Sequence, residues 1–276
     1  MVAACLILNR PRLVMIEADI PADFPQNSFS HEVFERLLRT YVDSSGNVDY
    51  SKWQQDEPDL RSLDSYLAAV SRYSPESSPE RFALRSDELA YWLYAYNAYV
   101  IKSILDRWPI ESVTSVKAPL ELVKGLGFFY QLRYLFGGEA YSLYAVENNI
   151  IRAQYRDARI HFVLNCASES CPVLRPELPA GEELEPFLQQ AAIDFVSDSR
   201  NVRIDHDKRE VVMSAIFKWY SKDFINDLRR RNLTSEHGLI DYVTSVAPVE
   251  LKEELRAASD FQIVFSDYDW AINNQK

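Results

Sequence analysis

The chain has 276 residues, of which 47% are hydrophobic and 13% aromatic, so it can bury a large core and is not of disordered composition. Its formal net charge of −11 disfavours nucleic acid and anionic membranes as partners, because like charges repel. No apolar run is long enough to span a bilayer, so we expect no transmembrane segment. Three cysteines are too few for a disulfide framework.

The first 28 residues are expected to form an irregular extension, because Pro11, Pro21 and Pro25 interrupt any long element. The apolar start lacks the basic residues that open a secretory signal, so we expect a cytoplasmic protein. Export stays open if the true N-terminus is missing from this sequence. We expect a single domain over residues 29–273 and a short tail over residues 274–276.

Apolar residues at helical spacing predict helices over residues 31–41, 60–73 and 89–108. The third of these segments is aromatic on nearly every side and is expected at the centre of the core, with Ser86 as its N-cap. Asn97 lies inside it, and a buried amide there either ties two elements together or faces an active cleft. His31, at the start of the first helix, is expected on the surface.

Residues 120–143 are rich in aromatic residues and glycine, which predicts strands or a hairpin, and a helix is expected over residues 143–155. The apolar run over residues 159–165 predicts a buried strand. The remaining elements are expected as helices over 182–197, 214–230, 239–246 and 250–257, a hairpin of 202–205 with 210–213, and a strand from 261. Together they predict an α+β fold, with helices packed on a small, mainly antiparallel sheet.

Three residues of rare types, His161, Cys166 and Cys171, lie within eleven positions of each other after an apolar run. An imidazole beside a thiol is the pairing that produces a thiolate nucleophile at neutral pH. Strand alternation places His161 and Cys166 on opposite faces, whereas Cys171 follows a loop that can fold back. Pro172 also suits the start of a short helix, whose N-terminus favours a thiolate. We therefore prefer Cys171 to Cys166 as the nucleophile.

The other members of such a site are expected nearby. Glu147 is able to accept a hydrogen bond from the second ring nitrogen of His161 and so orient it. Asn97, or the backbone amides of residues 167–171, would form an oxyanion hole.

Other chemistry fits the same residues. Cys166 and Cys171 are able to form a disulfide that closes the intervening loop, or a redox-active dithiol, and each also suits a buried structural position. The spacing of His161 and the two cysteines matches no usual zinc pattern, so we expect no metal and no cofactor.

The sequence resembles the domain-of-unknown-function 547 family over about residues 29–273 through six short motifs in the same order. They are Gly46-Asn-Val-Asp-Tyr50, Tyr91-Trp-Leu-Tyr-Ala-Tyr-Asn-Ala98, Arg159-Ile-His-Phe162, Asn165-Cys-Ala-Ser-Glu-Ser-Cys-Pro172, Ile216-Phe-Lys-Trp-Tyr-Ser-Lys-Asp-Phe224 and Asp267-Tyr-Asp-Trp270. The resemblance implies an α+β domain of unestablished activity, with a suspected likeness to papain-type thiol enzymes.

Two departures from the family pattern bear on this expectation. Tyr94 stands where the family usually has the first Asn of Trp-x-Asn-Ala-Tyr-Asn, and Asn148 follows Glu147 where the family often has Ile-Glu-His. Loss of that His would impair an enzyme that used it as the base, but His161 still supplies an imidazole.

The sequence therefore predicts a papain-like cysteine enzyme that transfers an acyl group, by hydrolysis or transpeptidation, on a small peptide-like amide. In this hypothesis Cys171 attacks, His161 takes the proton and Glu147 orients the ring. Two alternatives stay open: a non-catalytic binding or scaffold domain with structural cysteines, and a dithiol redox protein. The sequence leaves the oligomeric state open.

Overall fold

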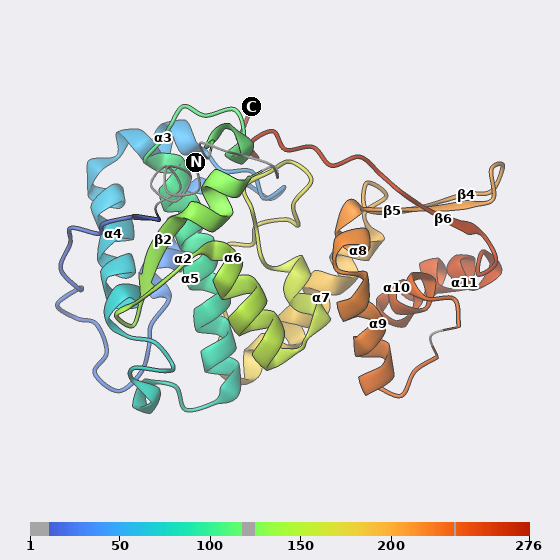
Figure 1. The fold of residues 1–276 in the computed structure, drawn as a ribbon, viewed down its shortest axis with the longest axis horizontal. Coiled ribbons are helices and arrows are strands. Elements are labelled where there is room, and N and C mark those ends of the chain that lie inside the picture. The colour runs from blue at the N-terminus through green and yellow to red at the C-terminus, as the bar shows by residue number, and fades with distance from the viewer. Residues whose placement is uncertain (1–10, 118–124, 235) are drawn as a thin grey trace, which may run out of the picture. The chain divides into compact units, whose positions relative to one another are not determined.

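The computed structural model describes residues 11–117, 125–234 and 236–276, and Figure 1 shows their helices and strands. The chain divides into two compact units. Unit 1 contains residues 1–155, 164–184 and 270–276, and unit 2 contains residues 156–163 and 185–269. The predicted α+β fold is confirmed, but the strands form two small sheets, each with one antiparallel and one parallel pair. Within the described residues, no helix is long and apolar enough to cross a membrane.

Unit 1 is mainly helical. Its helices are α2 (Glu32–Tyr41), α3 (Tyr50–Gln55), α4 (Glu57–Arg72), α5 (Arg85–Leu105), α6 (Leu143–Ala145) and its π-helical continuation η4 (Val146–Tyr155), with short turns η1 (Pro79–Arg81), η2 (Val113–Ser115), η3 (Leu126–Gln131) and η6 (Gly181–Glu183). Its sheet has the order β1 (Arg12–Leu13), β2 (Leu132–Phe136) and β3 (Glu139–Tyr141). The hairpin predicted within 120–143 is confirmed as β2 and β3, but residues 126–131 form the helical segment η3 and not a strand. Residues 120–124 of that prediction lie outside the described residues.

Helix α5 forms the centre of unit 1, as its aromatic sequence predicts, and Figure 1 shows it between α4 and the α6–η4 helix. Every residue from 89 to 101 is buried. Buried tyrosines of α5 donate their hydroxyl protons to backbone carbonyls, Tyr94 to Pro179 at 2.6 Å and Tyr99 to Leu135 at 2.6 Å. These bonds satisfy polar groups that would be costly to bury alone. The core is therefore aromatic without leaving these hydroxyl groups unbonded.

His31 is buried, and the prediction of a surface position is wrong. Its Nδ1 lies 2.9 Å from the Tyr66 hydroxyl, and its ring packs edge-on against Tyr94 at 4.9 Å between centroids. Helix α2 begins one residue later, at Glu32, so His31 is the residue before the helix and turns into the core. The sequence signal failed here because a histidine flanked by polar residues gives no sign of a buried tyrosine partner.

Unit 2 joins a second sheet to a cluster of helices. The sheet has the order β4 (Val202–Asp205), β5 (Glu210–Met213) and β6 (Gln262–Phe265). The helices are η5 (Ala158–Phe162), the part of α7 (Leu184–Ser197) from 185 onward, α8 (Ala215–Trp219), α9 (Ser221–Arg230), α10 (Leu239–Val246) and α11 (Val249–Ala257). Its core contains packed aromatic rings, with Phe162 stacked on Phe195 at 4.7 Å and Phe224 tilted against Tyr242 at 4.6 Å between centroids.

Several predicted helix boundaries differ from those in the structure. The helix expected over 214–230 is interrupted at Tyr220, whose backbone leaves helical geometry between α8 and α9. Helix α5 begins before Ser86, because the Asp87 carboxylate accepts the backbone N–H of Leu84 at 2.9 Å and so caps the helix from inside. Helix α4 begins three residues before the predicted residue 60, and α5 ends three residues before residue 108. The helices predicted over 182–197, 239–246 and 250–257 and the hairpin of unit 2 are confirmed to within two residues.

Candidate functional site

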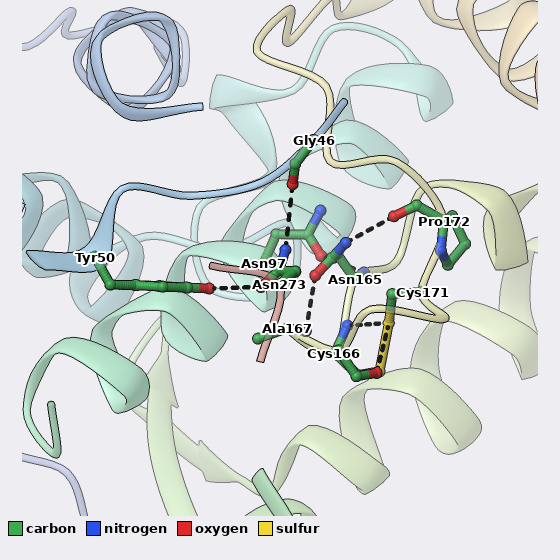
Figure 2. Close-up of a disulfide and its surroundings, with 10 residues drawn as sticks. Gly46, Tyr50, Asn97, Asn165, Cys166, Ala167, Cys171, Pro172 and Asn273 are labelled. Carbon is green, nitrogen blue, oxygen red and sulfur yellow. Dashed lines mark hydrogen bonds between the residues drawn. A yellow bond between two sulfur atoms is a disulfide. The ribbon is translucent and has the colours of Figure 1, made fainter. Parts of the chain in front are cut away.

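The two cysteines of the Asn165–Pro172 motif lie together in unit 1, in the loop of residues 165–172, which we call the cysteine loop. Cys166 and Cys171 are joined by a disulfide, with their Cα atoms 6.3 Å apart (Figure 2). Both residues are half-buried rather than enclosed. The sulfur pair is therefore held at short range and keeps some access to solvent.

Hydrogen-bond donors converge on the Cys171 sulfur. The backbone N–H of Cys166 donates to Cys171 Sγ at 2.9 Å, as Figure 2 shows. The hydroxyl of the buried Ser168 donates to the same sulfur at 3.5 Å and lies 3.0 Å from Cys166 Sγ. Donors aimed at a sulfur stabilise negative charge on it when the disulfide opens. A backbone N–H thus points at Cys171 Sγ, and the Ser168 hydroxyl lies within reach of both sulfurs.

An asparagine closes the base of the cysteine loop. The side chain of Asn165 accepts the backbone N–H of Ala167 at 2.7 Å and donates to the carbonyl of Pro172 at 2.8 Å (Figure 2). The backbone N–H of Asn165 donates in turn to Asn97 Oδ1 at 2.9 Å. Asn165 and Asn97 are each only 4% exposed, so water competes little for these bonds.

Residues 271–273, close to the end of the sequence, support the cysteine loop from another side. The N–H of Glu169 donates to the carbonyl of Ala271 at 2.8 Å, and the N–H of Asn273 donates to the carbonyl of Ala167 at 3.2 Å. The Asn273 side chain accepts from the Tyr50 hydroxyl at 3.1 Å and donates to the carbonyl of Gly46 at 3.2 Å. Figure 2 shows Asn273 bonded to both residues. Three distant stretches of sequence thus meet at this loop.

Three of the loop amides that the sequence suggests for an oxyanion hole donate hydrogen bonds within the fold. The N–H of Ala167 is bonded to Asn165, that of Glu169 to Ala271, and that of Cys171 to the Ser168 carbonyl at 2.9 Å. These bonds hold the loop in a tight turn, with Ala167 in the left-handed region at φ 59°. The structure likewise uses the Asn97 oxygen to tie helix α5 to the loop.

His161 lies in unit 2, and the strand predicted around it is wrong. It belongs to the 3₁₀ turn η5, which begins when the Asp157 carboxylate accepts the backbone N–H of Arg159 at 2.9 Å. The alternation that separates His161 from Cys166 on a strand therefore does not apply. The ring of His161 is 3% exposed and stacks on Tyr220 at 3.8 Å between centroids.

The partner of the His161 ring is Asp223. Its Oδ2 atom lies 2.9 Å from Nε2 of the imidazole. A carboxylate on one ring nitrogen fixes the orientation of the ring, which is the role that the sequence suggests for Glu147. Glu147 lies instead in η4 of unit 1, half-buried, and no hydrogen bond joins it to the cysteine loop in the described part of the chain.

The candidate site therefore consists of Cys166 and Cys171 with Ser168, Asn165 and Asn97. The sequence identifies the two cysteines and Asn97, but not Ser168 or Asn165 as their partners. The motif Asn165-Cys-Ala-Ser168 contains both, and an Asx-type bond to the residue two positions on is the local signal that points to Asn165. Among the described residues, no cluster of three or more His, Cys, Asp or Glu is suited to hold a metal ion.

One family model matches part of the chain. The model of the family described as "Protein of unknown function, DUF547" matches residues 79–196. This segment includes α5 with Asn97, η4 with Glu147, and the whole cysteine loop. No curated protein and no solved structure matches the chain. By this match, residues 79–196 are similar to the DUF547 family, whose function is not established.

Proposed function

We propose that the cysteine loop is a thiol–disulfide exchange site, in which Cys166 and Cys171 alternate between dithiol and disulfide. The observation that carries this proposal is the bond between the two sulfurs beside two donors to Cys171. Both cysteines are half-buried, so a small thiol or a peptide is able to approach them. A purely structural disulfide needs no donors directed at one of its sulfurs.

The exchange proceeds in two steps. A thiolate of a substrate dithiol attacks the Cys166 sulfur, the bond to Cys171 breaks, and Cys171 leaves as a thiolate held by the Cys166 N–H and the Ser168 hydroxyl. The second substrate thiolate then attacks the substrate sulfur of the mixed disulfide and releases the Cys166 thiolate. The substrate loses two electrons and two protons and becomes a disulfide, while both cysteines end as thiols. A peptide-like dithiol is the substrate class we propose.

The test is an equilibration of the folded protein with glutathione buffers of graded ratio, followed by acid quenching, alkylation and mass spectrometry of the 166–171 peptide. We expect one reversible two-electron transition, which disappears in both Cys166→Ser and Cys171→Ser and persists in the control Cys5→Ser. A disulfide that stays closed at every ratio, in protein that remains folded, would favour the scaffold alternative and remove the exchange proposal.

Acyl transfer by Cys171 is a second candidate, favoured by the same donors, because they also suit a thiolate nucleophile in the reduced protein. It requires one cysteine, whereas exchange requires two. We would therefore follow iodoacetamide alkylation of Cys171 against pH in Cys166→Ser. A reaction midpoint well below about 8.5 supports acyl transfer by Cys171, and a midpoint near about 8.5 excludes it.

A further inference from the structure

We infer that Asn165 is a positioning residue that sets how readily the two thiols of the reduced cysteine loop recombine. The inference rests on the proposed exchange function and concerns the equilibrium between its two states. Its basis is that the Asn165 side chain bonds on both sides of the cysteine pair, to Ala167 just after Cys166 and to Pro172 just after Cys171.

These two bonds do not depend on the sulfur–sulfur bond. In the oxidised loop the amide of Asn165 joins the N–H of Ala167 to the carbonyl of Pro172, at 2.7 and 2.8 Å, and we expect both bonds to persist when the disulfide opens. The backbones of Cys166 and Cys171 are therefore kept near the 6.3 Å Cα separation that they have in the disulfide. We call this pair of bonds the Asn165 clamp.

The clamp is itself anchored. The backbone N–H of Asn165 is held by Asn97 of the buried helix α5, and the carbonyl of Ala167 accepts the N–H of Asn273. Ala167 also occupies the left-handed region, at φ 59°, which an alanine adopts only where its surroundings enforce it. Because Asn165 and Ala167 are themselves held by Asn97 and Asn273, the clamp restricts the conformations of the reduced loop. An asparagine without these anchors would move together with the loop.

Restricting the reduced loop changes the redox equilibrium. The tendency of two thiols to form a disulfide follows their effective concentration, which falls as the reduced loop gains conformations. In the oxidised protein the disulfide already limits those conformations. Loss of the clamp therefore adds more conformations to the reduced state than to the oxidised state. Removing the clamp is therefore expected to favour the dithiol and make the reduction potential less negative.

The experiment compares Asn165→Ala with wild type in the same glutathione buffers, and measures the free energy of unfolding of the oxidised and reduced forms. We expect the disulfide equilibrium constant to fall at least tenfold, a shift of about 30 mV. Ser103→Ala is the matched control, because its buried hydroxyl bonds Tyr134 at 2.8 Å away from the loop. It is expected to lower stability in both forms and to leave the potential unchanged.

Asn165→Asp gives a second measurement if Asn165→Ala does not fold. It keeps an acceptor for the Ala167 N–H but removes the donor to Pro172, so a smaller shift in the same direction is expected. A folded variant at position 165 whose disulfide equilibrium constant stays within twofold of the wild-type value overturns the inference. That result leaves the exchange function standing, whereas wild-type protein without any reversible transition removes the function itself.

Discussion

The side-chain oxygen of Asn97 accepts the backbone N–H of Asn165 at 2.9 Å, and so connects the middle of helix α5 to the first residue of the cysteine loop. The two residues are 68 positions apart, and both are buried. A buried backbone N–H needs an acceptor, and at this point no strand or helix supplies one. Asn97 supplies this acceptor from the buried stretch of residues 89–101. Its role as an acceptor explains why an amide lies in a largely aromatic helix.

Replacing Asn97 should therefore destabilise the protein. In Asn97→Ala the N–H of Asn165 loses its acceptor while staying buried, which costs about 1–3 kcal/mol of unfolding free energy. Urea denaturation measures the loss. Asn149→Ala, an exposed asparagine of η4, is the control and should change stability by less than about 0.5 kcal/mol. Equal losses in the two variants would contradict the role assigned to Asn97.

Gly46→Ala should be more harmful than Gly138→Ala, although both glycines have positive φ, 81° and 92°. A Cβ atom at Gly46 would lie 2.6 Å from the backbone nitrogen of Leu174, whereas one at Gly138 would meet nothing within 4 Å. Both variants carry the left-handed penalty of about 1–2 kcal/mol, and only Gly46→Ala adds a clash with backbone. Thermal unfolding of the two variants tests the difference, and a Gly138→Ala loss as large as that of Gly46→Ala would refute it.

Removing the hydroxyl should lower the free energy of unfolding at Tyr50 but not at Tyr242, although both tyrosines are buried. Tyr50→Phe leaves Asn273 Oδ1 without the bond it accepts at 3.1 Å, so we expect a loss of about 1–3 kcal/mol. The Tyr242 hydroxyl is buried and has no hydrogen-bond partner among the described residues, so Tyr242→Phe should be neutral or stabilising. Guanidinium denaturation of both variants is the measurement. A clear loss in Tyr242→Phe would show that its hydroxyl is bonded after all.

His31 should make the protein less stable in acid. Burial lowers the pKa of His31 from 6.5 to about 3, because the imidazolium would lose its hydration among aromatic rings. Above pH 6.5 both folded and unfolded chains keep this ring neutral. Between that pH and about 3, only the unfolded chain takes up the proton. Its contribution to stability therefore falls as the pH falls, by about 1.4 kcal/mol per pH unit.

His31→Gln tests this dependence, because it removes the titrating ring and keeps a polar side chain beside Tyr66. The variant should lose less stability than wild type between pH 6.5 and 4.5, measured by urea denaturation at each pH. His237→Gln, at an exposed position, should follow the wild-type curve. Parallel curves for wild type and His31→Gln would mean that His31 is protonated in the folded state.

Much of the fold could be predicted from sequence because its longer elements carry their own signals. Helix α5 is apolar on every side, and the hairpin of β4 and β5 has a polar turn between two short apolar strands. Local patterns fix such elements without distant partners. The proximity of Cys166 and Cys171 in sequence likewise predicts that the two thiols are able to meet.

The misjudged elements are those whose conformation depends on polar partners that the apolar pattern of the segment does not reveal. The apolar segment around His161 has the composition of a strand, yet Arg159 binds Asp157 at 2.6 Å and Glu185 at 2.7 Å, and the chain turns instead. The hydrogen bonds from the cysteine loop to Ala271 and Asn273 join residues more than one hundred positions apart. No periodicity or spacing in the sequence predicts that such distant residues pair.

A ribosome makes the cysteine loop long before it makes Ala271 and Asn273, the backbone partners of Glu169 and Ala167. While the chain is still being translated, these two loop residues therefore have no strand to pair with. The thiols of Cys166 and Cys171 meet the redox conditions of the cell first in an unfinished loop, and again after release in a completed one. The native setting of this cysteine pair is thus acquired only after translation has passed residue 273.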